Sequence, residues 1–383
     1  MPKSRSRKKP KPVALKGPLP DEITLPRVPR APGNLESIHL LGTMLQQAIN
    51  GGRVMHASVV VTEPGDILGY GFAGNPASSV VAMKGHKIVS DLIDRRYRER
   101  VDGKRDDTLD ASYHEYNLAI DPINYDFLIW LIDAEMTRRR LGAPAPLRVG
   151  FSHEKEMNEK GKRFWAAVHK PLLPLIGAIE DPEAIGGFRS AQFTPTQICM
   201  AARRGEKVPV LEASEEARNH VKGWLHGRPP PVTITLREGS HWSKRNSNVE
   251  AWVKFARDRQ AKGEFVIFVR DTEKANEPLE DFITYPDASF SIQPRMALYE
   301  LAKCNLYVSN GPAGLGLFSN RPYLYFLQLQ DDEEYEPNNP AWWLRANGIG
   351  NGDQWPWALP TQKMIWKRDD YKHLCEAWEE HGH

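Results

Sequence analysis

Short apolar segments alternate with helix-like segments between residues 232 and 327, and this alternation constrains the fold more than any other feature of the chain. Short, largely apolar strands separated by helices are typical of a parallel sheet that is buried on both faces. The expected strands are 232–236, 265–269, 289–292, 305–309 and 323–327, and the expected helices are 249–262, 276–282, 295–303 and a short one after residue 312. The sequence therefore predicts an α/β domain that binds ligands at the carboxyl ends of its strands.

The first half of the chain has a similar but weaker pattern. A strand at 116–120, a helix at 125–141 and a strand at 147–151 would form one βαβ unit. A helix at 35–50 and a hairpin of 54–61 with 67–72 precede it. We expect a second α/β domain over residues 35–211, beside one over 212–367, and a C-terminal helix within 368–383.

The N-terminal segment, residues 1–34, is expected to be a disordered tail. It contains eight prolines, and residues 1–16 carry seven Lys or Arg and no acid. A segment with so little apolar content cannot offset the entropy cost of ordering. Such a tail can bind the anionic surface of a membrane or nucleic acid, or act only as a solubilising extension. Formal net charge is +2, so the remainder of the chain is acidic overall, which argues against nucleic acid as a partner.

Composition and motif absences exclude several classes of protein. No apolar run approaches the ~20 residues that span a bilayer, and the basic N-terminus lacks the apolar stretch of a secretory signal. The three cysteines, Cys199, Cys304 and Cys375, are far apart and are expected to be reduced thiols rather than zinc ligands. We therefore predict a cytoplasmic protein; peripheral contact with the inner face of the membrane is the alternative to a purely solubilising role for its tail.

The residues after the strand at 232–236 are suited to phosphate. The loop carries Arg237, Ser240, Lys244 and Arg245, which offer three cations and a hydroxyl. The structural alternative is that Arg237 pairs with Glu238 or another neighbouring acid.

Two further strand ends carry candidate ligand-binding residues. Small residues after 305–309 would let backbone amides approach an anion, although a tight turn would use the same glycines. These candidates are Ser309, Asn310, Gly311, Ala313 and Gly314. After 265–269, Arg270 and Asp271 could bind a base or ribose, and Asp271 could equally cap a helix.

Other motifs give mostly negative information. Residues 69–74 match G-x-G-x-x-G, but they fall in the expected hairpin rather than between a strand and its helix, so a dinucleotide site is not expected. The signatures of P-loop hydrolases, zinc metalloproteases and serine hydrolases are absent. No Asp-x-Asp pair occurs, so no metal ligands and no cofactor are predicted. Five tryptophans lie between residues 341 and 367, where they could stack on sugars but more simply anchor an irregular segment.

The C-terminal half resembles the donor-binding domain of GT-B-fold glycosyltransferases. The segment VTITLREGSHWSKRNSNVEAWVKFA is similar to the strand, basic loop and helix of heptosyltransferase-like enzymes, in which a lysine contacts donor phosphate, and Lys244 matches it. It also resembles the HLRxGSDW-like segment of protein O-fucosyltransferases, whose arginine contacts the pyrophosphate, and Arg237 matches it. The segment ALYELAKCNLYVSNGPAGLGLFSNRPYLYF is similar to the nucleotide-sugar loop region of both families.

This resemblance implies two Rossmann-like domains facing a cleft, with the acceptor at the N-terminal domain, the donor at the C-terminal domain, and the last helix returning to the N-terminal domain. The implied activity is metal-independent transfer of a sugar from a nucleoside-diphosphate sugar to a glycan, lipid-linked or protein acceptor, as in cell-envelope glycan biosynthesis. Arg237, Lys244 and Arg245 would stabilise the leaving diphosphate.

The sequence leaves several candidates for the catalytic base and several possible activities. Candidates for the base that deprotonates the acceptor are Asp121, Asp126, His153 and Glu154. The alternatives to transfer are a sugar-nucleotide epimerase or hydrolase on the same fold, or a non-catalytic protein that binds a nucleotide sugar or nucleic acid.

Overall fold

The computed structural model describes residues 56–61, 67–73, 111–119, 121–185, 187, 195–240, 243–329, 343 and 349–381. The chain divides into two compact units, Met1–Arg105 and Asp106–His383, and both parallel sheets lie in the second. The expected tail at 1–34 and helix at 35–50 lie outside the described residues. The expected domain limits at residues 211 and 367 stay predictions. Among the described residues, no helix has the length and apolar character needed to cross a membrane.

The expected N-terminal hairpin is confirmed. Strands β1 (His56–Val61) and β2 (Ile67–Ala73) pair antiparallel. The glycines at 69 and 71 therefore lie inside a strand of a hairpin, where they cannot form the strand-to-helix turn of a dinucleotide site.

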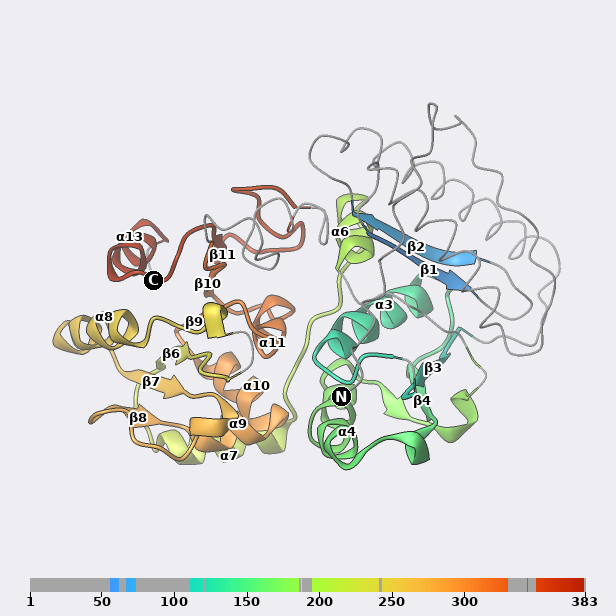
Figure 1. Cartoon of the computed structure of the whole chain (residues 1–383), viewed down its shortest axis with the longest axis horizontal. Coiled ribbons are helices and arrows are strands. Elements are labelled where there is room, and N and C mark those ends of the chain that lie inside the picture. The colour runs from blue at the N-terminus through green and yellow to red at the C-terminus, as the bar shows by residue number, and fades with distance from the viewer. Residues whose placement is uncertain are drawn as a thin grey trace, which may run out of the picture. The chain divides into compact units, whose positions relative to one another are not determined.

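A six-stranded parallel sheet dominates the second unit (Figure 1). Its order is β11-β10-β9-β6-β7-β8, so the chain starts in the middle, runs out to one edge, and returns to fill the other side. This is the order of a doubly wound Rossmann sheet. The strands are β6 (Val232–Thr235), β7 (Val266–Val269), β8 (Ile283–Thr284), β9 (Cys304–Val308), β10 (Tyr323–Phe326) and β11 (Gln362–Ile365).

Both faces of this sheet are covered, because successive side chains of each strand point to opposite faces. On one face, Val232, Ile234 and Leu236 pack with the apolar residues of α8 (Val249–Ala261). On the other face, strand residues such as Ile267 and Tyr307 join a separate core. That core is covered by α7 (Glu215–Leu225), α9 (Pro286–Phe290), α10 (Ile292–Leu301) and α11 (Ala313–Leu317).

A smaller parallel sheet precedes it, with the order β3-β4-β5. The expected βαβ unit is confirmed: β3 (Tyr113–Asn117) leads through α3 (Asp126–Arg140) to β4 (Arg148–Ser152), and β5 (Ile179–Glu180) follows. The remaining helical elements are η2 (Glu154–Glu156), α4 (Glu159–Phe164), η3 (Trp165–His169), α5 (Lys170–Leu172), η4 (Leu173–Ile176), η5 (Pro182–Ala184), α6 (Thr196–Arg203), η6 (Ser243–Arg245) and η7 (Thr272–Lys274).

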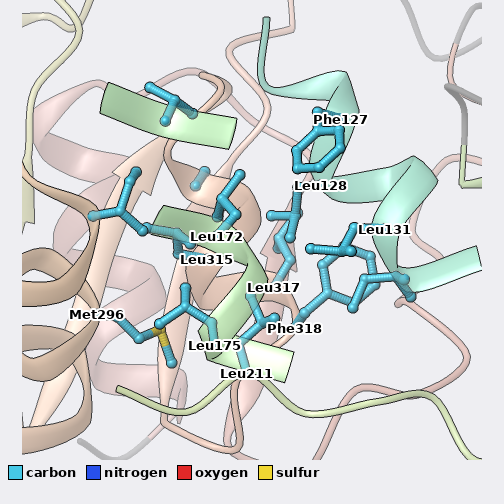
Figure 2. Close-up of a cluster of buried hydrophobic side chains, with 14 of the residues drawn as sticks. Phe127, Leu128, Leu131, Leu172, Leu175, Leu211, Met296, Leu315, Leu317 and Phe318 are labelled. Atoms are coloured by element: carbon cyan, nitrogen blue, oxygen red, sulfur yellow. The ribbon is translucent and has the colours of Figure 1, made fainter. Parts of the chain in front are cut away.

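One hydrophobic core joins the two sheet regions. Figure 2 shows Leu128 and Leu131 of α3 close to Leu315 and Leu317 of α11, with Met296 of α10 in the same cluster. All five side chains are at most 8% exposed. The expectation of a mixed α/β fold with parallel sheets is therefore confirmed.

The prediction of secondary structure between β7 and α10 was wrong. Residues 276–282 form no helix, and the segment around 289–292 is helical instead of extended. Pro286 occupies the first position of α9, where proline has the backbone angle that a helix needs and loses no hydrogen bond. The third strand is β8, only two residues long, which is too short to give a periodic signal.

The expected return of the last helix to the N-terminal domain also needs correction. Helix α13 (Tyr371–His381) packs on α8, beside the six-stranded sheet. Leu374 and Trp378 are buried in the core that α8 covers, and the rings of Trp378 and Phe255 lie 5.8 Å apart. The apolar side of α13 is thus matched by a partner within the same sheet region.

Candidate functional site

The two phosphate-suited loops meet at the centre of the six-stranded sheet. Strands β6 and β9 are neighbours, yet the helices that follow them, α8 and α11, pack on opposite faces. In open α/β sheets, ligands bind outside the carboxyl ends of strands at this kind of switch point. The structure therefore brings the loop after β6 and the loop after β9 to the position where a ligand is expected.

The loop after β6, called the β6 loop, comprises residues 237–248, of which 241 and 242 are outside the described residues. Its ends are joined by two hydrogen bonds between Arg237 and Ser247: the Arg237 N–H donates to Ser247 Oγ and the Ser247 N–H to the Arg237 carbonyl, both at 2.8 Å. The Arg237 guanidinium donates to Asn246 Oδ1, while Asn246 Nδ2 donates to the Gly239 carbonyl at 2.9 Å. Asn246 thus holds both the arginine and the loop.

Glu238, which the structural alternative gave as a partner of Arg237, is paired with Arg270 instead. Arg270 donates to both Glu238 oxygens, at 2.9 and 2.5 Å, and each side chain is 6% exposed. The third Arg270 nitrogen donates to the carbonyls of Glu277 and Pro278 at 3.1 Å. This pair closes the gap between the loops after β6 and β7 and raises the pKa of Arg270.

Asp271 and Ser240 also join the loop after β6 to the loop after β7. Asp271 caps η7 by accepting from the Thr272 N–H at 2.7 Å, and its second oxygen accepts from the Glu238 N–H at 3.4 Å. The Ser240 hydroxyl donates to Glu273 at 3.4 Å. The capping alternative for Asp271 is therefore what the structure shows.

Arg245 links the β6 loop to the loop after β9. One of its terminal nitrogens donates to the Ser309 carbonyl at 3.0 Å and to Ser309 Oγ at 3.1 Å. Ser309 is 5% exposed, so this arginine is anchored at the sheet, while Lys244 beside it is exposed. The two neighbouring cations consequently differ: one is fixed between the strands and one lies on the surface.

The glycines after β9 make room for protein side chains. A Cβ on Gly311 would lie 2.5 Å from the Tyr125 ring, and one on Gly314 would lie 2.9 Å from Leu128. The amides of Ala313 and Gly314 already donate within the loop, to Asn310 Oδ1 and the Gly311 carbonyl. Packing against α3 therefore explains these small residues, and their expected contact with an anion stays a prediction.

The start of α3 places an acid near the basic loop. Asp126 Oδ2 accepts from Asn124 Nδ2 at 2.9 Å, and Asn124 Oδ1 accepts from the Asp126 N–H at 2.7 Å. Burial raises the pKa of Asp126, and the positive charge of Arg245 opposes that rise. The buried ring of His169 contacts the Asn124 carbonyl through Nε2 at 3.0 Å, which fixes the residue that holds Asp126.

The other candidate bases are placed less favourably. Asp121 accepts from the Asn117 N–H at 2.7 Å and so shapes the turn after β3. His153 and Glu154 are exposed after β4, and His153 has a left-handed backbone conformation, with φ at 61°. Sequence reasoning missed Asn124 and Asn246, whose only signal was their position beside charged residues at element ends.

The C-terminal tryptophans mostly serve packing. Trp343 and Trp355 are 5% and 4% exposed, and Trp357 stacks on Phe318 with 5.2 Å between ring centroids. Trp366 donates its indole N–H to the Asp353 carbonyl at 2.7 Å. For these described residues, the anchoring interpretation agrees with the structure.

No protein-family model and no curated protein matches the chain. Among solved structures, the chain is similar to a family 9 glycosyl transferase from Veillonella parvula, with 10% identity, a TM-score of 0.43, and coverage of 70% of this chain and 97% of that one. It is similar to ADP-heptose LPS heptosyltransferase II of E. coli, with 8% identity, a TM-score of 0.43, and coverage of 70% and 98%. A third similar structure is E. coli heptosyltransferase WaaC with ADP-2-deoxy-2-fluoro heptose, with 11% identity, a TM-score of 0.38, and coverage of 70% and 99%.

Proposed function

We propose that this chain is a metal-independent glycosyltransferase that transfers a sugar from a nucleoside-diphosphate sugar to a glycan, lipid-linked or protein acceptor. The observation that carries the proposal is the position of Arg237, Lys244 and Arg245 on one loop at the switch point of a doubly wound parallel sheet. Negative charge develops on the diphosphate as the bond to the sugar breaks, and cations already in place stabilise it.

In the proposed reaction, Arg237 binds the diphosphate through two parallel hydrogen bonds. Asn246 orients this guanidinium before the ligand arrives, which lowers the reorganisation needed in the transition state. Arg245 adds fixed positive charge, and exposed Lys244 adds charge that can move to the ligand. Glu238 does not neutralise Arg237, since Arg270 occupies it.

Asp126 is the proposed general base. Its raised pKa brings it closer to the pH at which a base works best, and it lies near Arg245 at the start of α3. In this assignment, Asp126 removes the proton from the attacking hydroxyl of the acceptor. Asn124 donates to Oδ2 of Asp126, and in this assignment Oδ1 of Asp126 takes the proton from the hydroxyl of the sugar acceptor.

The proposal predicts that the protein binds a nucleoside-diphosphate sugar equally well with and without divalent metal. Titration calorimetry with a panel of nucleoside diphosphates and their sugars, in EDTA and in Mg²⁺, measures this directly. A ligand at 100 times its Kd should also add about 2.7 kcal/mol to the free energy of unfolding. Binding that requires the metal, or no binding across the panel, would contradict the proposal.

Asp126→Asn should abolish transfer without lowering stability. An acid whose pKa is raised on folding is costly in its charged form, so the folded state loses stability as the pH rises through that pKa. The neutral amide removes this cost at pH 7 and can still accept the Asn124 hydrogen bond. We expect an unchanged or higher Tm, and wild-type turnover that falls with acid at a higher pH than an ordinary aspartate would give. A variant with normal turnover would exclude Asp126 as the base.

The basic tail is proposed to hold the protein at anionic membranes. Deleting residues 1–30 should leave Tm and nucleotide binding unchanged but weaken binding to vesicles that contain anionic lipid. Each basic residue near such a surface is worth about 1 kcal/mol at low salt, and the tail carries seven in residues 1–16. Co-sedimentation with vesicles at low and high salt measures the effect, and neutral vesicles are the control. Equal vesicle binding by both proteins would remove the membrane role.

A further inference from the structure

Gln328, two residues beyond the end of β10, has an unusual combination of properties. Its φ is 53°, in the left-handed region that residues other than glycine rarely adopt, and it is 3% exposed. Such a backbone conformation costs free energy and persists only where surrounding structure enforces it.

The side-chain amide of Gln328 contacts the β6 loop. Its Nε2 donates to the Asn246 carbonyl at 2.7 Å and lies 3.4 Å from an oxygen of Asp369. Both partners are acceptors, so the amide nitrogen must face them and the amide cannot be reversed. The oxygen Oε1 is consequently directed elsewhere, where it is buried with no hydrogen-bond partner among the described residues. A strained and half-satisfied glutamine is a poor choice for stability alone.

Asp369 holds the same loop at its other end. It is 5% exposed, and one of its oxygens accepts from the Asn248 N–H and from the Trp252 indole N–H, both at 2.8 Å. Asn248 is the N-cap of α8, so the exit of the β6 loop is fixed by Asp369 as its interior is fixed by Gln328. Burial raises the pKa of Asp369.

The Gln328 contact acts on the residues proposed to bind phosphate through Asn246. Asn246 holds the Arg237 guanidinium by its side chain, and Arg245 directly precedes it in the chain. A shift of the Asn246 backbone therefore moves both arginines relative to the sheet. The segments that follow β10 and β11 therefore help to set where the two charges lie, together with the hydrogen bonds within the β6 loop.

We propose that Gln328 and Asp369 are positioning residues that hold the β6 loop in the conformation that binds a diphosphate. The binding part of this inference rests on the proposed function, whereas the ordering of the loop does not. Neither residue touches the ligand in this assignment. Each acts through Asn246 or Asn248.

The test compares Gln328→Asn with a matched control. Asparagine tolerates the left-handed conformation but is one methylene too short to reach the Asn246 carbonyl. The control is Gln362→Asn, because Gln362 is 1% exposed and donates to the carbonyls of Ser319 and Arg321 at the amino end of the sheet. Gln362 Oε1 also accepts from the Leu359 N–H at 2.9 Å, so the control removes more buried hydrogen bonds than Gln328→Asn, at the opposite end of the strands from the β6 loop.

Two measurements are made on the full chain. Hydrogen exchange of the peptide covering residues 237–248, without ligand, should be about tenfold faster in Gln328→Asn and unchanged in Gln362→Asn. The Kd for inorganic pyrophosphate, measured by calorimetry, should be about tenfold weaker in Gln328→Asn, as expected for one hydrogen bond. Tm should fall less in Gln328→Asn than in the control, since asparagine relieves backbone strain.

The outcomes separate this inference from the proposed function. Wild-type exchange and wild-type Kd in Gln328→Asn would overturn the inference, and so would equal losses in both variants. Faster loop exchange in Gln328→Asn, together with no pyrophosphate binding by the wild type, would overturn the proposed function and leave the ordering role of Gln328 supported.

Discussion

Replacing Arg237 by alanine should lower sugar transfer by about 100- to 1000-fold, the usual loss when one preorganised transition-state donor is removed. The fold should survive, because the bonds that close the β6 loop join the backbone of Arg237 to Ser247 and do not involve the guanidinium. Arg237→Lys should also be poor, since a single ammonium cannot reproduce the planar pair of donors that Asn246 orients. Turnover, nucleotide affinity and Tm are measured for both variants.

The matched control for this prediction is Arg257→Ala. Arg257 lies on α8, is 42% exposed, and pairs with Glu280 and Asp281 on the surface. An exposed pair is worth about 0–1 kcal/mol, so its loss should leave turnover unchanged. If Arg237→Lys instead behaves as wild type, or if Arg237→Ala loses activity only in proportion to a collapse in Tm, then Arg237 is a structural residue.

Whereas Arg237→Ala should lower turnover and leave stability intact, Arg270→Ala should cause a large loss of stability. The variant leaves the Glu238 carboxylate buried at 6% exposure with no countercharge, and removing one partner of such a pair costs about 3–5 kcal/mol. For a unit of this size, that corresponds to a fall in Tm of roughly 6–20 °C. Thermal unfolding of the wild type and the variant at pH 7 measures it.

A double variant identifies the cause. Arg270→Met combined with Glu238→Leu should recover most of the lost Tm, because a buried ion pair can often be replaced by apolar groups at little cost. A small change in Tm together with a large loss of nucleotide affinity would show instead that Arg270 binds the ligand, the role that its position at a strand end first indicated.

The sequence by itself determined the parallel sheet and the strand ends at which the candidate basic residues lie. The run Val266–Val269 is apolar at every position, and Val232–Thr235 consists of β-branched residues throughout. A strand covered on both faces buries every side chain of such a run. The place of Arg237 at a strand end followed from the same pattern. These are local properties, since they depend on the order of residue types within about ten positions.

Tertiary structure alone decided which partners the two arginines contact and which side chains pack against the glycines. Arg237 and Arg270 both follow buried strands and both have an acid as their next residue. Because strands β6 and β7 are paired, Glu238 contacts Arg270, while the Arg237 guanidinium contacts Asn246. The sequence around Gly311 suggested contact with an anion. In the structure, the ring of Tyr125, nearly 190 residues earlier in the chain, occupies the space where a side chain at position 311 would lie. The sequence provided no indication of a role for Gln328 and Asp369, because their contacts with the β6 loop form only when distant strand ends are brought together. A local pattern of residue types does not specify which of several possible partners a polar side chain will contact in the folded protein.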